Sequence, residues 1–195
     1  MQTNLFLVRH AHSDYTPDEV GRPLSQSGWE DAKIVTDLLK NQRIDHIISS
    51  PYKRAIQTVE GIAKYIDKEV EINTGFKERV LSENPVEDFR HAIRKVWEEP
   101  SFYWKGGESN LIAQKRGIEA IKQVLVRYKG KNIVIGTHGN IMTLMINHFD
   151  NRYDYHFWKE LDMPDIYQLI FDDMKLLEIH RVWERNKDLM VNVRI

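Results

Sequence analysis

The sequence contains no cysteine, which excludes disulfide bonds, thiolate nucleophiles and zinc sites built on cysteine. It also lacks any apolar run of about 18 to 20 residues, the length needed to cross a bilayer. The N-terminus has no charged segment followed by a long apolar run, so a secretory signal is not expected. We therefore expect a cytoplasmic protein without a membrane partner. A Walker loop and a paired-glycine dinucleotide fingerprint are absent as well.

Neither sign of charge is in excess. The chain has 28 basic and 29 acidic residues, a net charge of −1, which gives no reason to expect a nucleic-acid partner. Any anion-binding site must come from local clustering. With 195 residues, of which 42% are hydrophobic, the chain is long enough to bury a core and too apolar to be disordered. We expect a single domain over residues 1–195, and the sequence does not predict the oligomeric state.

Short apolar runs alternate with segments that have apolar residues at helical spacing. The expected strands cover 5–8, 44–48, 70–72, 133–135, 166–171 and 176–182, and the expected helices cover 25–42, 51–66, 85–98, a stretch ending near 128, and a segment after 139. This order predicts an α/β fold: a three-layer α/β/α sandwich with a mainly parallel sheet and one C-terminal antiparallel hairpin. The segment of about 76–110 fits the pattern least and is expected to form a small helical cap or insertion.

Groups suited to anion binding follow three of the predicted strands. They are Arg9 and His10 after the first strand, Ser50 and Arg54 after the second, and His138 and Gly139 after the strand at 133–135. Pro51 suits the first position of a helix, which makes Ser50 its expected N-cap. In open α/β sheets ligands bind outside the carboxyl ends of parallel strands, so these groups should converge on one pocket. Arginine forks and helix N-termini favour a dianion such as a phosphoryl group.

Several motifs resemble signatures of the histidine phosphatase superfamily, also called the phosphoglycerate mutase-like family. A hydrophobic strand followed by Arg-His occupies 5–10, with Ala11 in place of the usual glycine. Five further segments match motifs of the family. A Leu-Ser-x-x-Gly helix start lies at 24–28, a Ser-x-x-x-Arg-Ala-x-x-Thr segment at 50–58 and a Glu-Arg pair at 78–79. A Gly-Gly-Glu-Ser turn lies at 106–109 and a Thr-His-Gly segment at 137–139. The motifs come in the family's order and cover about residues 4–171. In length the chain is closer to broad-specificity phosphatases than to glycolytic mutases.

The resemblance implies a role for each site residue. His10 is the expected nucleophile, and a neutral imidazole is a suitable one near pH 7. Arg9, Arg54 and His138 are expected to hold the phosphoryl oxygens, with His138 protonated or at least donating a hydrogen bond. Glu78 is the expected proton donor to the leaving group.

Other residues are candidates for substrate contacts or for an alternative proton donor. Thr16 lies near the position of an asparagine found in many members, and Thr16 and Gly139 are expected to contact substrate. Glu83 and Glu108 are alternative proton donors, and His12 is a candidate substrate contact. The aromatic residues at 97 and 102–104 are expected in the core, with an apolar wall for the leaving group as the alternative.

The expected function is a cofactor-independent histidine acid-type phosphatase that hydrolyses small phosphorylated metabolites through a phosphohistidine on His10. The alternatives are a phosphoglycerate mutase and a non-catalytic phospho-ligand binding domain. No metal is expected: the spacing of His10 and His12 suits a metal pair, but enzymes built on such a pair need a much longer barrel. Ser13 lacks a nucleophile elbow, which argues against a serine hydrolase.

Overall fold

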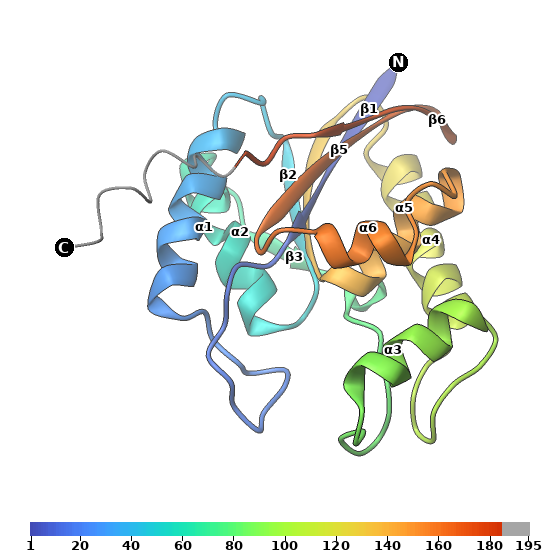
Figure 1. Cartoon of the computed structure of the whole chain (residues 1–195). Coiled ribbons are helices and arrows are strands. Elements are labelled where there is room, and N and C mark those ends of the chain that lie inside the picture. The colour runs from blue at the N-terminus through green and yellow to red at the C-terminus, as the bar shows by residue number, and fades with distance from the viewer. Residues whose placement is uncertain (185–195) are drawn as a thin grey trace.

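The apolar run at 5–8 lies at the centre of a mixed sheet (Figure 1). The computed structural model describes residues 1–184, and within them six strands pair in the order β3-β2-β4-β1-β5-β6. The strands are β1 (Gln2–Arg9), β2 (His46–Ser49), β3 (Val70–Ile72), β4 (Asn132–Thr137), β5 (Asp165–Asp172) and β6 (Lys175–Arg181). The first four run parallel, and β5 is antiparallel to both β1 and β6. The predicted α/β class with a C-terminal hairpin is confirmed.

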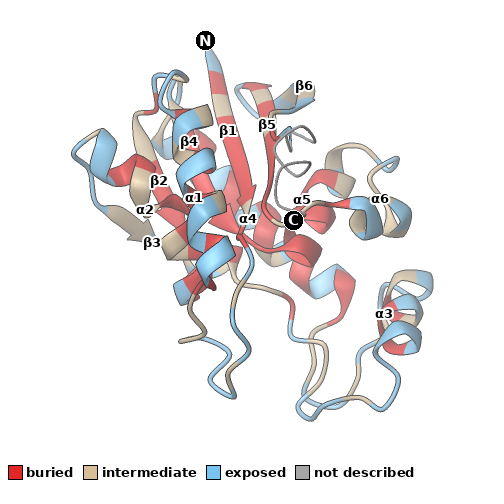
Figure 2. Cartoon of the chain, turned by 60° about the vertical axis from the view of Figure 1, so that its left-hand side comes forward, coloured by how far each residue is buried: buried red, intermediate tan, exposed pale blue. Residues whose placement is uncertain are grey.

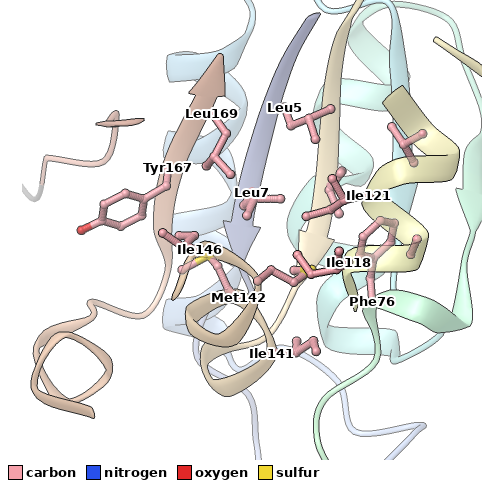
Figure 3. Packing of buried hydrophobic residues seen from close by; sticks show 14 of the residues in the cluster. Leu5, Leu7, Phe76, Ile118, Ile121, Ile141, Met142, Ile146, Tyr167 and Leu169 are labelled. Carbon is pink, nitrogen blue, oxygen red and sulfur yellow. The ribbon is translucent and has the colours of Figure 1, made fainter. Parts of the chain in front are cut away.

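Helices cover both faces of the sheet, as a buried parallel sheet requires. Along β1, Leu5 and Leu7 pack against α4 (Asn110–Arg127) and α5 (Gly139–Phe149), as Figure 3 shows. The alternate residues of β1 point to the other face, which α1 (Gln26–Leu39) and α2 (Lys53–Tyr65) cover. The central strands are accordingly buried in Figure 2. Both predicted outer layers are present.

The segment 76–110, expected to form a cap, contains α3 (Phe89–Glu98), which lies away from the sheet in Figure 1. Its buried face consists of Ala92, Ile93 and Val96, and the indole of Trp104 donates to the carbonyl of Ala92. Two elements were not predicted, η1 (Thr74–Phe76) and α6 (Tyr155–Glu160). Both are too short to show an apolar periodicity. Within residues 1–184, no helix combines the length and the hydrophobicity that crossing a membrane requires.

Side-chain caps explain most of the helix starts. Ser25 accepts the N–H of Gly28 at the start of α1. The predicted N-cap of α2 was wrong: the helix begins at Lys53 with Tyr52 in the N-cap position, and Ser50 accepts the N–H of Tyr52 (3.3 Å) just before the helix. The hydroxyl of Ser50 is also 2.7 Å from Nε2 of His138.

We predict that Trp183→Ala strongly destabilises the protein. Trp183 follows β6, is only 1% exposed and packs in the core between the sheet and the α1–α2 layer. Loss of a fully buried indole should lower the free energy of unfolding by about 3–5 kcal/mol in a denaturant titration. Trp29→Ala is the control, because Trp29 is 37% exposed and should cost much less. Equal losses in the two variants would contradict this packing.

Candidate active site

The sheet register brings the ends of three strands together. Arg9 pairs with Thr137 at the ends of β1 and β4, and Ser49 pairs with Gly136 in β2 and β4. Beyond β1, the N–H of His10 continues the ladder by donating to the carbonyl of Thr137 (3.0 Å). The residues that follow these three strands therefore lie at one edge of the sheet, where the topology places a ligand site.

A cavity of about 510 Å³ opens at this edge. Its charged and titratable lining includes Arg9, His10, Arg22, Arg54, Glu78 and Arg79. Its apolar lining includes Leu81, Phe89 and Ile93 of α3, Trp158 of α6, and Met163. The aromatic residues at 97 and 102–104 do not line it, so the alternative that they form an apolar wall for the leaving group was wrong.

His10 presents an unprotonated Nε2. Its Nδ1 lies 2.7 Å from the carbonyl oxygen of Ala11, and because a carbonyl only accepts, Nδ1 carries the proton. The lone pair on Nε2 accepts from Nε of Arg54 (3.2 Å). Burial, followed by the charge of Arg54, lowers the pKa of His10 to about 3. The ring is therefore neutral over the physiological range, and Nε2 keeps a lone pair, which Arg54 occupies in this structure.

Arg54 is held by a loop carboxylate. Its Nη1 donates to the carbonyl of Glu19 and its Nη2 to Oε1 of the same residue, both at 2.7 Å. Glu19 also pairs with Arg22, while its own side chain is 50% exposed. With Nε on His10, three of the five N–H donors of Arg54 are engaged, two of them by Glu19. An anion that takes the place of Glu19 would gain both of those donors.

Arg9 lies against the first residue of α5. Its Nη1 donates to the carbonyls of Leu161 and Asp162, which fixes the guanidinium. A Cβ at Gly139 would come 3.1 Å from Nε of Arg9, so a side chain here would push the guanidinium by a few tenths of an ångström. Gly139 therefore belongs to the site through the space it leaves for Arg9.

His138 lies beside His10 and is fully buried. The ring centroids are 5.1 Å apart. Nε2 of His138 bonds the Ser50 hydroxyl, and its buried Nδ1 has no hydrogen-bond partner in residues 1–184. Burial, followed by the charges of His10 and Arg54, holds the pKa of His138 well below its ordinary value. Without a ligand, His138 is neutral.

Glu78 is positioned by the N-terminus of α5. Its carboxylate accepts the N–H groups of Asn140 (3.2 Å) and Ile141 (3.1 Å), which have no acceptor within the helix. The alternatives lie elsewhere: Glu108 is paired with Arg116, Glu83 is exposed in the loop, and neither lines the cavity. Of the three candidate proton donors, only Glu78 lies in the wall of the cavity.

Two remaining candidates differ in their placement. His12 lines the cavity, with Nδ1 2.8 Å from the Ser25 hydroxyl. Thr16 does not line it, and its hydroxyl donates to the carbonyl of Asp18 within the loop. A substrate contact by Thr16 stays a prediction. Among residues 1–184, no cluster of three or more histidine, aspartate or glutamate side chains could hold a metal ion.

Sequence reasoning missed three charged residues of the site and one hydrogen bond. Glu19 and Arg22 lie on a loop without periodicity, so no pattern indicates that they reach the cavity. Arg79 could have been found from its place beside Glu78 in the Glu-Arg pair. The bond between Ser50 and His138 was hidden by the stronger expectation of a helix cap.

We predict that His10 does not titrate in the ordinary histidine range. In the ligand-free protein, its imidazole ¹⁵N and ¹H shifts should stay those of the neutral, Nδ1-protonated ring from about pH 8 down to about pH 5, because burial lowers its pKa to about 3. NMR with selectively labelled histidine measures this. Exposed His156 provides the internal control for the probe. A midpoint for His10 in the ordinary range, roughly pH 6 to 7, would contradict the proposed environment.

The chain is similar to known proteins both in sequence and in fold. A sequence profile of the histidine phosphatase superfamily (branch 1) matches residues 5–179. Phosphoserine phosphatase 1 of Hydrogenobacter thermophilus is 29% identical over 97% of this chain and 92% of its own length. A mycobacterial glucosyl-3-phosphoglycerate phosphatase has a similar fold, with a TM-score of 0.75, 17% identity, and coverage of 93% of this chain and 97% of its own.

A mutant phosphoserine phosphatase from Entamoeba histolytica, solved in complex with phosphoserine, also has a similar fold. Its TM-score is 0.74 at 22% identity, with coverage of 91% of this chain and 96% of its own. These structures share the architecture, and the profile match covers most of the sequence. The chain belongs to the histidine phosphatase superfamily (branch 1).

Proposed function

We propose that the protein is a phosphatase that hydrolyses small phosphomonoesters through a phosphohistidine on His10. One observation carries the proposal: a neutral imidazole with its Nε2 lone pair beside a buried arginine lines the same cavity as a carboxylate. A binding domain needs cationic groups for a phosphate, but it needs neither a nucleophile nor a proton donor. The arrangement therefore favours an enzyme over a binding module.

Substrate binding exchanges one set of contacts for another. The phosphoryl group takes the place of the Glu19 carboxylate on Arg54, since both are oxyanions and Glu19 is half exposed on a loop. It also separates Nε of Arg54 from Nε2 of His10, which frees the lone pair. Arg9, which two backbone carbonyls hold in place, donates to another of the phosphoryl oxygens.

The proposed reaction has two displacements. In the first, the Nε2 lone pair of His10 attacks phosphorus, an N–P bond forms, and the bond from phosphorus to the leaving oxygen breaks. The leaving oxygen takes a proton from Glu78. In the second, Glu78 removes a proton from water, the water oxygen attacks phosphorus, and the N–P bond breaks. Inorganic phosphate leaves, and both side chains return to their starting states.

His138 acts as a neutral donor in this scheme. If the Ser50 hydroxyl donates to Nε2, the proton of the neutral ring lies on Nδ1, the nitrogen without a partner in residues 1–184. A hydrogen bond from Nδ1 to a phosphoryl oxygen then needs no imidazolium, although a bound dianion would favour one. The resemblance left two states of His138 open, a protonated ring and a neutral ring that donates a hydrogen bond. Burial favours the neutral ring.

The relatives support this class of substrate. The similar proteins include a phosphoserine phosphatase and a glucosyl-3-phosphoglycerate phosphatase, which act on small phosphomonoesters. We propose that this protein also acts on small phosphomonoesters, and we do not assign one physiological substrate. No metal takes part in the proposed reaction, since arginines supply the positive charge around phosphorus.

We predict that His10→Ala abolishes turnover and phosphoenzyme formation while the protein stays folded. Phosphate release from an aryl phosphate should fall by at least about a thousandfold, because no other group replaces the nucleophile. Brief incubation of the wild type with a ³²P-labelled phosphomonoester should trap an acid-labile, alkali-stable label at position 10. His148→Ala, an exposed position remote from the cavity lining, should behave as wild type. Label on another residue would contradict the assignment, and isomerised phosphoglycerate with little free phosphate would favour a mutase.

We predict that Glu78→Gln affects poor leaving groups most. Glutamine keeps an acceptor for the α5 N–H groups but cannot donate a carboxyl proton. kcat/KM should fall about 10²–10⁴-fold for alkyl phosphates and much less for an aryl phosphate, whose phenolate leaves without a proton. Glu83→Gln, on an exposed residue, is the matched control. Equal losses on both substrate types would show that Glu78 is not the proton donor.

A further inference from the structure

Arg9 takes its orientation from two carbonyl groups of one short segment. Its Nη1 donates to the carbonyl of Leu161 (2.9 Å) and to that of Asp162 (3.1 Å), in the segment that joins α6 to β5. Its Nε has no hydrogen-bond partner within residues 1–184, which leaves that edge of the guanidinium for a ligand in the cavity. A shift of residues 161–162 would therefore turn the arginine that is proposed to hold a phosphoryl oxygen.

A buried carboxylate holds that segment in place. Asp165, at the start of β5, is fully buried, and its Oδ2 accepts the backbone N–H of Asp162 (3.0 Å). Its Oδ1 accepts the backbone N–H of Ile166 (2.9 Å). Asp165 is also the residue that pairs with Arg9 in the register of β1 and β5. It therefore pairs with the end of β1 and, through its carboxylate, holds the segment whose carbonyls orient Arg9.

Arg181, the last residue of β6, binds the same carboxylate. Its Nε donates to Oδ1 of Asp165 (3.0 Å) and its Nη2 to Oδ2 (2.8 Å), a bidentate pair. Nη2 also donates to the carboxylate of Asp162 (2.8 Å). Burial raises the pKa of Asp165, and the bonds from Arg181 oppose that rise, which favours the ionised carboxylate. Arg181 therefore fixes the position and the charge of the group that holds residues 161–162.

We propose that Arg181 is a positioning residue for the phosphoryl site, acting on Arg9 through Asp165 and the carbonyl groups of 161–162. This inference rests on the proposed function and adds the C-terminal hairpin to it, although within residues 1–184 no residue of β5 or β6 lines the cavity. A pair that only tied the hairpin to the preceding segment would stabilise the fold without changing how Arg9 binds an anion. A double-mutant cycle with Arg9 separates the two roles.

The cycle compares Arg9→Met, Arg181→Met and the variant that carries both substitutions. The readouts are kcat and KM for p-nitrophenyl phosphate and the inhibition constant of orthovanadate. Arg181→Met should lower kcat/KM and raise the inhibition constant, each by about tenfold, and Arg9→Met should do so more strongly. In the Arg9→Met background, the substitution of Arg181 should change both constants by less than about twofold, because the side chain through which it acts is gone.

A purely structural role gives a different pattern. If Arg181→Met only reduced the folded fraction, kcat would fall while KM and the vanadate constant kept their wild-type values, and the loss would recur in the Arg9→Met background. Arg127→Met is the matched control, because it breaks an ion pair between α4 and Glu71 of β3 without touching the cavity lining, and it should leave all constants unchanged. If Arg181→Met does not fold, Arg181→Lys, which keeps the charge but loses the fork, replaces it in the cycle with a smaller effect. Additive losses, or a wild-type vanadate constant in a folded Arg181 variant, would overturn the proposal.

Calorimetric binding of inorganic phosphate keeps the two proposals distinguishable, because it does not depend on turnover. If no phosphomonoester is hydrolysed, the proposed function fails. Phosphate binding that Arg181→Met weakens, and that is no weaker in the double variant than in Arg9→Met, still supports the positioning role. Phosphate binding that is unchanged in folded Arg181→Met contradicts it.

Discussion

The hydrogen bond from Nδ1 of His10 to the carbonyl of Ala11 determines the chemistry of the whole site. It places the ring proton on Nδ1 and leaves the lone pair on Nε2, where Arg54 now lies. Burial adds a second constraint, because it keeps the ring neutral. A charged imidazole would have no lone pair to attack phosphorus, and the other tautomer would turn its N–H toward Arg54. The fold supplies this bond by ending β1 directly before His10.

Internal contacts position the charged groups around His10 before a ligand binds. Arg54 is compensated by Glu19, a partially exposed loop carboxylate that a phosphoryl group can replace. Arg9 is oriented by carbonyls, and Glu78 by the first N–H groups of α5. The donors are thus in place before the ligand arrives, so little reorganisation is needed during the reaction.

Much of the fold and of the central site could be predicted from the sequence, because both rest on local patterns. The apolar runs mark the strands, and parallel strands bring the residues after β1 and β4 to one edge whatever the loops do. Contacts that depend on loop conformation could not be predicted. Glu19 reaches Arg54 across 35 positions, and nothing in the spacing indicates it. Ser50 matched a helix-cap pattern, and its hydroxyl does accept the nearby N–H of Tyr52, but the local pattern gave no indication of its second bond, to His138.

The central claim is that Nε2 of His10 attacks a phosphoryl group held by the surrounding arginines. A crystal structure of the protein with orthovanadate tests it most directly, because vanadate adopts the five-coordinate geometry of the transition state. The account predicts vanadium bonded to Nε2 of His10, equatorial oxygens on Arg9 and Arg54, and the Glu19 carboxylate displaced from Arg54. Vanadate bonded to a different side chain, or bound with Glu19 still on Arg54, would contradict it.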